Sequence, residues 1–89
     1  MKSQTTARFR SLLASASAQR QAKIRAAYRL WQANPDHPSI RFKKVHPEQP
    51  IYSARVDLNW RAVGVLDGDT LVWFWIGPHD QYNALLKSL

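Results

Sequence analysis

The sequence of 89 residues contains no cysteine and only three glycines. Without thiols the chain has no disulfide framework, no thiolate metal site and no cysteine nucleophile. Long hydrophobic runs are also missing: the longest, residues 71–77, has seven members, whereas a membrane-spanning helix needs about 20. These absences exclude thiol redox chemistry and a transmembrane protein, and they are typical of a soluble protein in the reducing cytoplasm.

Acidic residues are absent from the N-terminal part. Residues 1–35 hold seven of the 13 Lys and Arg residues and no Asp or Glu, while residues 36–89 hold six of each sign. The net charge of +7 therefore arises entirely in the first 35 residues. Such a surface attracts polyanions: nucleic acid, an anionic membrane surface or an acidic protein. A stretch rich in Arg, Ala and Ser is also typical of a transit peptide. The helical patterns within these residues favour the interpretation that they form part of the folded domain.

The residues that are present predict one small α+β domain over residues 1–89. A chain of this length buries only about 60–65 % of its unfolded surface, so its core needs large side chains. The four Trp, three Tyr and three Phe residues meet that need.

Two amphipathic helices are predicted in the N-terminal third. Apolar residues at helical spacing mark both of them: Phe9, Leu12, Leu13 and Ala16 in the first, and Ile24, Ala27, Tyr28 and Trp31 in the second. Thr5 or Thr6 can cap the first helix, and Ser15 or Ser17 the second. The short connection predicts a helical hairpin, which ends at Asn34 before Pro35.

Beyond residue 35 the apolar period changes from 3.6 to 2, which predicts strands. An edge strand is expected at residues 40–45, and strands at 51–56, 60–66 and 71–76 with short hairpin loops. A final helix is expected at residues 80–89, with Leu85, Leu86 and Leu89 facing inward. The predicted architecture is an N-terminal helical hairpin packed on a three- to four-stranded antiparallel sheet, with a short C-terminal helix.

Hairpin geometry predicts a cluster of reactive side chains. If residues 57–59 form the first loop, Arg55 lies directly across from Arg61, and opposed like charges are unfavourable unless an anion lies between them. If Gly68 and Asp69 form the second loop, Arg61 pairs with Ile76, and His79 and Tyr82 follow at the same end of the sheet. Arg41, Lys43 and Lys44 add positive charge nearby and are candidate RNA-binding residues.

This set suits RNA cleavage by transesterification. His79 can move a proton, Arg55 and Arg61 can neutralise the phosphorane, and Tyr82 can stack on a base or assist a proton transfer. No cofactor is implied and no metal is expected, since His37 and His46 lack paired spacing with acids.

Each residue also has an ordinary structural interpretation. His79 can be a helix-capping residue, Tyr82 a core residue, and the arginines can cross the sheet or pair with Asp57 and Asp80. The aromatics expected on the opposite strand face, Tyr52, Trp60, Trp73 and Trp75, form either the core or an exposed face that buries itself in a homodimer.

Four stretches resemble the RelE/ParE superfamily of bacterial toxin–antitoxin toxins: residues 34–45, 52–56, 60–63 and 73–82. The ending Ile-Gly-x-His-x-x-Tyr at residues 76–82 is the most specific and is closest to the HigB-like pattern. Residues 1–5 are short and polar and do not show the strand with which this family usually begins. Pro78 and Asp80 also depart from the family pattern, and Glu48 is the only Glu.

The resemblance implies a toxin neutralised by an acidic antitoxin. Many such toxins are metal-independent mRNA interferases that act on the ribosome, so the implied catalytic set is Arg55, Arg61, His79 and Tyr82. The superfamily also contains toxins that bind DNA gyrase without cutting nucleic acid, and an inactive partner-binding relative is a third interpretation. Fold alone does not separate these functions.

Overall fold

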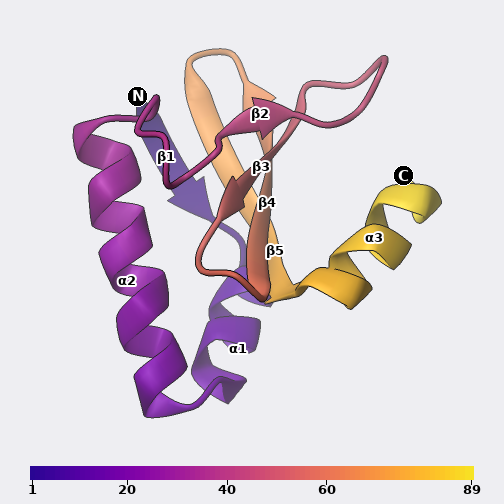
Figure 1. The fold of residues 1–89 in the computed structure, drawn as a ribbon. Coiled ribbons are helices and arrows are strands. Elements are labelled where there is room, and N and C mark those ends of the chain that lie inside the picture. The colour runs from indigo at the N-terminus through magenta and orange to yellow at the C-terminus, as the bar shows by residue number, and fades with distance from the viewer.

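The computed structural model describes all of residues 1–89. One sheet with strand order β1-β5-β4-β3-β2 forms its centre, and the helices α1 and α2 lie on one side of it (Figure 1). None of the helices has the length and apolarity to cross a membrane. The elements in chain order are β1 (Lys2–Thr5), α1 (Ala7–Ser15), α2 (Ala18–Ala33), β2 (Lys43–Lys44), β3 (Ile51–Arg55), β4 (Trp60–Asp67), β5 (Thr70–Pro78) and α3 (His79–Ser88).

The helical hairpin is confirmed, together with one cap from each predicted pair. The Thr6 hydroxyl accepts a hydrogen bond from the Phe9 amide at 3.1 Å, and the Ser17 hydroxyl accepts one from the Arg20 amide at 3.1 Å. Both bonds satisfy amides that the first helical turn leaves unpaired. Asn34 ends α2, as predicted.

A fifth strand at the N-terminus corrects the predicted sheet. Residues 2–5 form β1, which pairs in parallel with β5 from Lys2↔Thr70 to Thr5↔Trp73. The sheet is therefore mixed and not purely antiparallel. Polar side chains suit β1 because it is an edge strand that is nowhere fully buried. The Ser3 hydroxyl also hydrogen-bonds the Tyr28 hydroxyl on α2.

The edge strand predicted at residues 40–45 is mostly wrong, because only Lys43 and Lys44 form a strand. Ile40 is buried in the core at 2 % exposure, and its carbonyl accepts the Arg55 amide at 2.6 Å. Arg41 then has a φ of 48°, in the left-handed region that costs a non-glycine residue about 1–2 kcal/mol. The chain thus turns at Arg41 where a continuous strand was expected.

A bulge in β5 divides the aromatic residues between the two faces of the sheet. Gly64 pairs with Trp73 but Val63 pairs with Trp75, so Phe74 is the extra residue. Trp73 consequently packs in the cluster beneath the helices, whereas Trp75 packs on the opposite face. Tyr52, Trp60 and Trp73 therefore share the face opposite the arginines, as predicted, and only Trp75 departs from the predicted face. No aromatic residue is among the exposed large hydrophobics, so the argument for a dimer from such a face is wrong.

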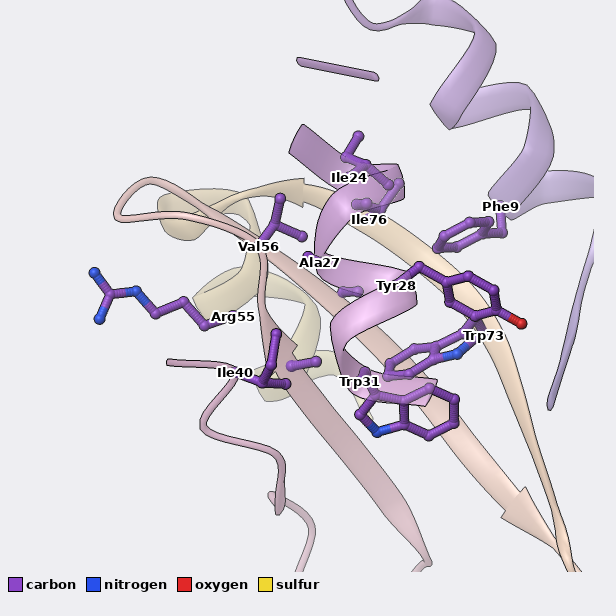
Figure 2. A pocket seen from close by; sticks show the side chains of 12 residues that line it. Phe9, Ile24, Ala27, Tyr28, Trp31, Ile40, Arg55, Val56, Trp73 and Ile76 are labelled. Carbon is purple, nitrogen blue, oxygen red and sulfur yellow. The ribbon is translucent and has the colours of Figure 1, made fainter. Parts of the chain in front are cut away.

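The apolar core therefore has two parts. The larger part lies between the helical hairpin and the sheet and centres on Trp31, Trp73 and Ile76; Figure 2 shows these side chains converging there. The smaller part lies on the other face, where Tyr82 of α3 packs with Val63, Ile51 and Trp75. Leu85 and Leu86 pack against it as predicted, but Leu89 is 41 % exposed and does not face inward.

Gly77 provides a test of this smaller core. A Cβ at this position would lie 2.6 Å from Cζ2 of Trp75, whose side chain is itself buried. We expect Gly77→Ala to lower the free energy of unfolding by about 1–3 kcal/mol because the buried indole must move. Gly68→Asn is the matched control: its φ of 62° suits Asn and a Cβ there meets open space. Thermal unfolding followed by circular dichroism measures both, and equal stability of the two variants would contradict the prediction.

Candidate functional site

A positively charged pocket of about 210 Å³ opens at the end of the sheet where β3 and β4 are joined and α3 begins. It brings together six of the seven candidate residues from the sequence. In Figure 2 the Arg55 side chain points away from the apolar side chains that lie between the sheet and α2. The pocket is lined by Arg41, Lys43, Ser53, Arg55, Arg61, His79 and Tyr82.

Arg55 and Arg61 face each other across the first hairpin, as the loop length predicted. The two residues are direct register partners of β3 and β4. The partner predicted for Arg61 on β5 was Ile76, and the structure corrects it to Gly77. The bulge at Phe74 shifts this part of the register by one residue.

The Arg61 guanidinium is held by the backbone of its own hairpin. Its Nη1 donates to the carbonyl oxygens of Asp57 at 2.8 Å and Trp60 at 3.0 Å. No hydrogen bond within the protein engages its Nε or Nη2. Burial lowers the pKa of Arg61, and the nearby positive charge of Arg55 lowers this pKa further. Arginine remains charged despite such a shift. The Arg61 guanidinium is therefore a pre-oriented cation at the pocket, and its Nε and Nη2 can donate hydrogen bonds to an anion.

Neither arginine forms the ion pair that would make its role purely structural. The only ion pairs in the chain join Lys2 to Asp69, and Arg20 and Lys23 to Asp57. The predicted structural alternative, in which Asp57 and Asp80 neutralise Arg55 and Arg61, is therefore wrong. The pocket retains uncompensated positive charge, which favours an anionic ligand.

Strand alternation places one of the two neighbouring lysines in the pocket and the other outside it. Lys43 is the register partner of Ser53 and lines the pocket. Lys44 is the partner of Tyr52, whose side chain packs against the helix-side cluster. Successive strand residues point to opposite faces, so Lys44 lies outside the pocket and its predicted part in RNA binding is not supported. Arg41 reaches the pocket from the left-handed turn.

His79 is the exposed first residue of α3 at the pocket wall. Its amide donates to the Asn59 carbonyl at 2.7 Å, which ties the start of α3 to the first hairpin loop. Its Nδ1 lies 3.5 Å from Nδ2 of Asn83, one helical turn along. The ring is 5.6 Å from the Tyr82 ring, centre to centre, at an angle of 40°. The imidazole is thus accessible to a ligand in the pocket.

Tyr82 is a core residue, which was one of its interpretations from the sequence. The residue is 6 % exposed and its ring packs in the smaller core, so the ring is not available to stack on a nucleotide. Its hydroxyl donates to Ser53 Oγ at 3.1 Å. Ser53 is 2 % exposed and is the one buried polar residue of the chain. The sequence analysis missed Ser53, although its position two residues before Arg55 places it on the same strand face.

The chemistry available in the pocket follows from these groups. Four cations can hold and neutralise a phosphate, and the His79 imidazole can donate or accept a proton. No carboxylate lines the pocket, and no cluster of His, Asp or Glu in the chain has the composition of a metal site. The arrangement suits phosphate binding combined with proton transfer by one imidazole.

Comparison with known protein families identifies the class to which this small domain belongs. Residues 18–84 match the ParE-like toxin domain family, and the chain belongs to that family. No significant match was found among curated protein sequences.

Solved structures of similar fold are toxins of the same class. YafQ from E. coli strain BL21(DE3) is 14 % identical with a TM-score of 0.71, over 91 % of this chain and 96 % of that chain. RelE in the RelB–RelE antitoxin–toxin complex from Methanococcus jannaschii is 15 % identical with a TM-score of 0.70, over 91 % and 95 %. The YoeB/ParE toxin from Agrobacterium tumefaciens is 18 % identical with a TM-score of 0.69, over 89 % and 99 %. These matches confirm the α+β fold expected from the sequence.

Proposed function

We propose that this protein is the toxin of a type II toxin–antitoxin pair and that it inhibits translation as an mRNA interferase. The observation that carries the proposal is the pocket in which Arg41, Lys43, Arg55 and Arg61 surround an open space beside His79 without a carboxylate. Membership of the ParE-like toxin domain family supports the toxin role. The unpaired cations favour RNA as the anion over a non-catalytic protein target.

The proposed reaction is cleavage by internal transesterification. The ribose 2′-oxygen attacks the adjacent phosphorus as its proton leaves, and the bond from phosphorus to the 5′-oxygen breaks as that oxygen gains a proton. The products are a 2′,3′-cyclic phosphate and a 5′-hydroxyl end. The phosphorane carries more negative charge than the substrate, so cations fixed in advance stabilise it more than they stabilise the bound RNA.

The residues divide this work according to their positions. Arg61 has its guanidinium already oriented by two carbonyls, so we assign it to the phosphorane, with Arg55 as its opposed partner. His79 transfers one of the two protons. Arg41 and Lys43, which are exposed at the pocket rim, bind flanking phosphates. Tyr82 and Ser53 anchor α3 to β3 through their hydrogen bond and thereby fix the position of His79 three residues earlier.

Induction of the gene in bacteria followed by primer extension on cellular mRNA tests this function. An mRNA interferase that acts on the ribosome leaves cuts in codon register, and these cuts should accompany growth arrest. Growth arrest without cuts would indicate a toxin that binds another target, such as DNA gyrase. Absence of both would indicate an inactive relative and would contradict the proposal.

We further propose that an acidic antitoxin binds the helical side of the protein. Solved neighbours include toxins in complex with the antitoxins RelB and DinJ. In this chain the exposed Arg8, Arg10, Arg25 and Arg29 form no ion pair. A groove of about 360 Å³ runs between α1 and α2, with Arg25 and Arg29 among its walls and Phe9, Leu13, Ile24 and Tyr28 providing apolar and aromatic surface. An acidic segment with apolar side chains complements it in both charge and hydrophobicity.

Charge reversal tests this surface. We expect Arg25→Glu combined with Arg29→Glu to weaken antitoxin binding about a hundredfold, because two attractive contacts become repulsive. Isothermal titration with the cognate antitoxin measures the change. Toxicity without the antitoxin should persist, since both residues lie outside the basic pocket. Lys87→Glu, an exposed charge change on α3, is the control. Unchanged affinity of the double variant would show that the antitoxin binds elsewhere.

A further inference from the structure

We propose that Asp57, which lies outside the basic pocket, is a positioning residue that holds the Arg61 guanidinium in the orientation required for phosphate binding. The proposal rests on the function proposed above, in which Arg61 contacts the scissile phosphate. Its basis is a set of contacts in which one aspartate orders the β3–β4 loop and joins it to α2.

The Asp57 carboxylate organises the loop with one oxygen. Its Oδ1 accepts the amides of Asn59 at 2.9 Å and Trp60 at 3.0 Å. This pattern is an Asx turn, in which a side chain takes the place of a backbone acceptor. The last amide of the short hairpin loop and the first amide of β4 are thereby fixed from within the loop.

The second oxygen joins the loop to the helical hairpin. Asp57 Oδ2 forms an ion pair with Arg20 and lies 3.9 Å from the Lys23 ammonium. The Arg20 guanidinium carbon is 4.8 Å from the centre of the Trp60 ring, so α2 also contacts the first residue of β4. The side chains of Asp57 and Arg20 are only 20 % and 26 % exposed, so their ion pair is partly shielded from water and stronger than a surface pair.

The ordered loop in turn presents two carbonyls to the pocket residues. The Asp57 carbonyl accepts Arg61 Nη1 at 2.8 Å, and the Asn59 carbonyl accepts the His79 amide at 2.7 Å. Because the carboxylate fixes the loop and the loop carbonyl fixes the guanidinium, loss of the carboxylate should release Arg61 without removing any group from the pocket. Misplacement of about 1 Å near a reaction centre can lower a rate about a hundredfold.

Two substitutions separate the contributions of the carboxylate. Asp57→Ala removes both oxygens, whereas Asp57→Asn retains an oxygen that can accept the Asn59 and Trp60 amides and loses only the ion pair. We expect RNA cleavage on programmed ribosomes to fall about a hundredfold in the first variant and less than about tenfold in the second. Asp67→Ala, an exposed aspartate in the other hairpin, is the matched control and should cleave at the wild-type rate.

A double-mutant cycle shows whether Asp57 acts through Arg61. In an Arg61→Ala background the further change Asp57→Ala should lower cleavage by less than about threefold, because the group that Asp57 positions is already absent. A second loss of a hundredfold would show that Asp57 acts by another route, such as general folding, and would overturn the proposal.

A second measurement is independent of RNA cleavage. Relaxation of the ¹⁵N nucleus at Arg61 Nε should report an ordered side chain in the wild type and in Asp57→Asn, and motion like that of exposed Arg8 in Asp57→Ala. If the wild type cuts no RNA but this pattern holds, the proposed function fails while the positioning role stands. If Arg61 stays ordered in folded Asp57→Ala protein, the positioning role is overturned whatever the activity.

Discussion

Arg61→Ala should lower RNA cleavage by at least about a hundredfold and abolish growth arrest on induction. When an enzyme loses one hydrogen-bond donor that is already positioned to stabilise the negative charge of the transition state, its rate typically falls by a factor of about 10²–10³. Arg61 has this character because two carbonyls orient its Nη1 while Nε and Nη2 carry no bond within the protein. Arg61→Lys should recover only a small part of the activity, since an ammonium group has no planar fork for two phosphate oxygens.

The measurement is the cleavage rate on programmed ribosomes, with thermal unfolding to confirm the fold. Arg8→Ala is the control, because Arg8 is exposed on α1 outside the basic pocket. Full activity of a folded Arg61→Ala protein would remove this guanidinium from the mechanism and leave phosphate binding to the other pocket residues.

His79→Gln should lower cleavage by about 10²–10⁴-fold, the usual contribution of general acid–base catalysis by a positioned side chain. Glutamine can still hydrogen-bond Asn83 and an RNA oxygen but has no titratable proton near neutrality. RNA affinity should therefore change little while the rate of the chemical step falls.

The pH dependence of cleavage gives a second readout for His79. A group that transfers a proton in the reaction contributes a limb to the pH–rate profile, so the wild-type profile should have a limb that is absent from His79→Gln. His37→Asn is the matched control: His37 Nδ1 only accepts the Ser39 amide and hydroxyl within a turn, and Asn can also accept there. An unchanged pH profile in His79→Gln would exclude His79 as the proton-transfer group.

Much of the fold could be predicted because its signals are local. The helix caps Thr6 and Ser17 and the helical spacing of apolar residues concern positions within a few residues of one another. The register of Arg55 with Arg61 likewise follows from the length of a short loop. Local geometry of this kind leaves little freedom, so the residue pattern alone determines it.

The details of the site were less predictable because they depend on distant segments. The Phe74 bulge has no sequence signature, yet it moves Trp75 to the face opposite Trp73 and shifts the partner of Arg61 to Gly77. One extra residue reverses which face every later side chain occupies. A prediction based on strict alternation therefore placed Trp75 on the wrong face, while Tyr52, Trp60 and Trp73 lie on the predicted one.

Sequence patterns were sufficient to specify the order of the elements that follow β1, the excess positive charge and the meeting of two arginines at one end of a sheet. Long-range packing specified the parallel pairing of β1 with β5, the turn at Arg41, the exclusion of Lys44 and the burial of Tyr82 against Ser53. The difference has a physical cause. Helix caps, the periodic spacing of apolar residues and tight turns depend on residues that are close together in the sequence. The residue types at those positions therefore indicate them directly. Backbone pairing and side-chain burial join positions up to about 70 residues apart, and they depend on which surfaces remain uncovered once the local elements have formed.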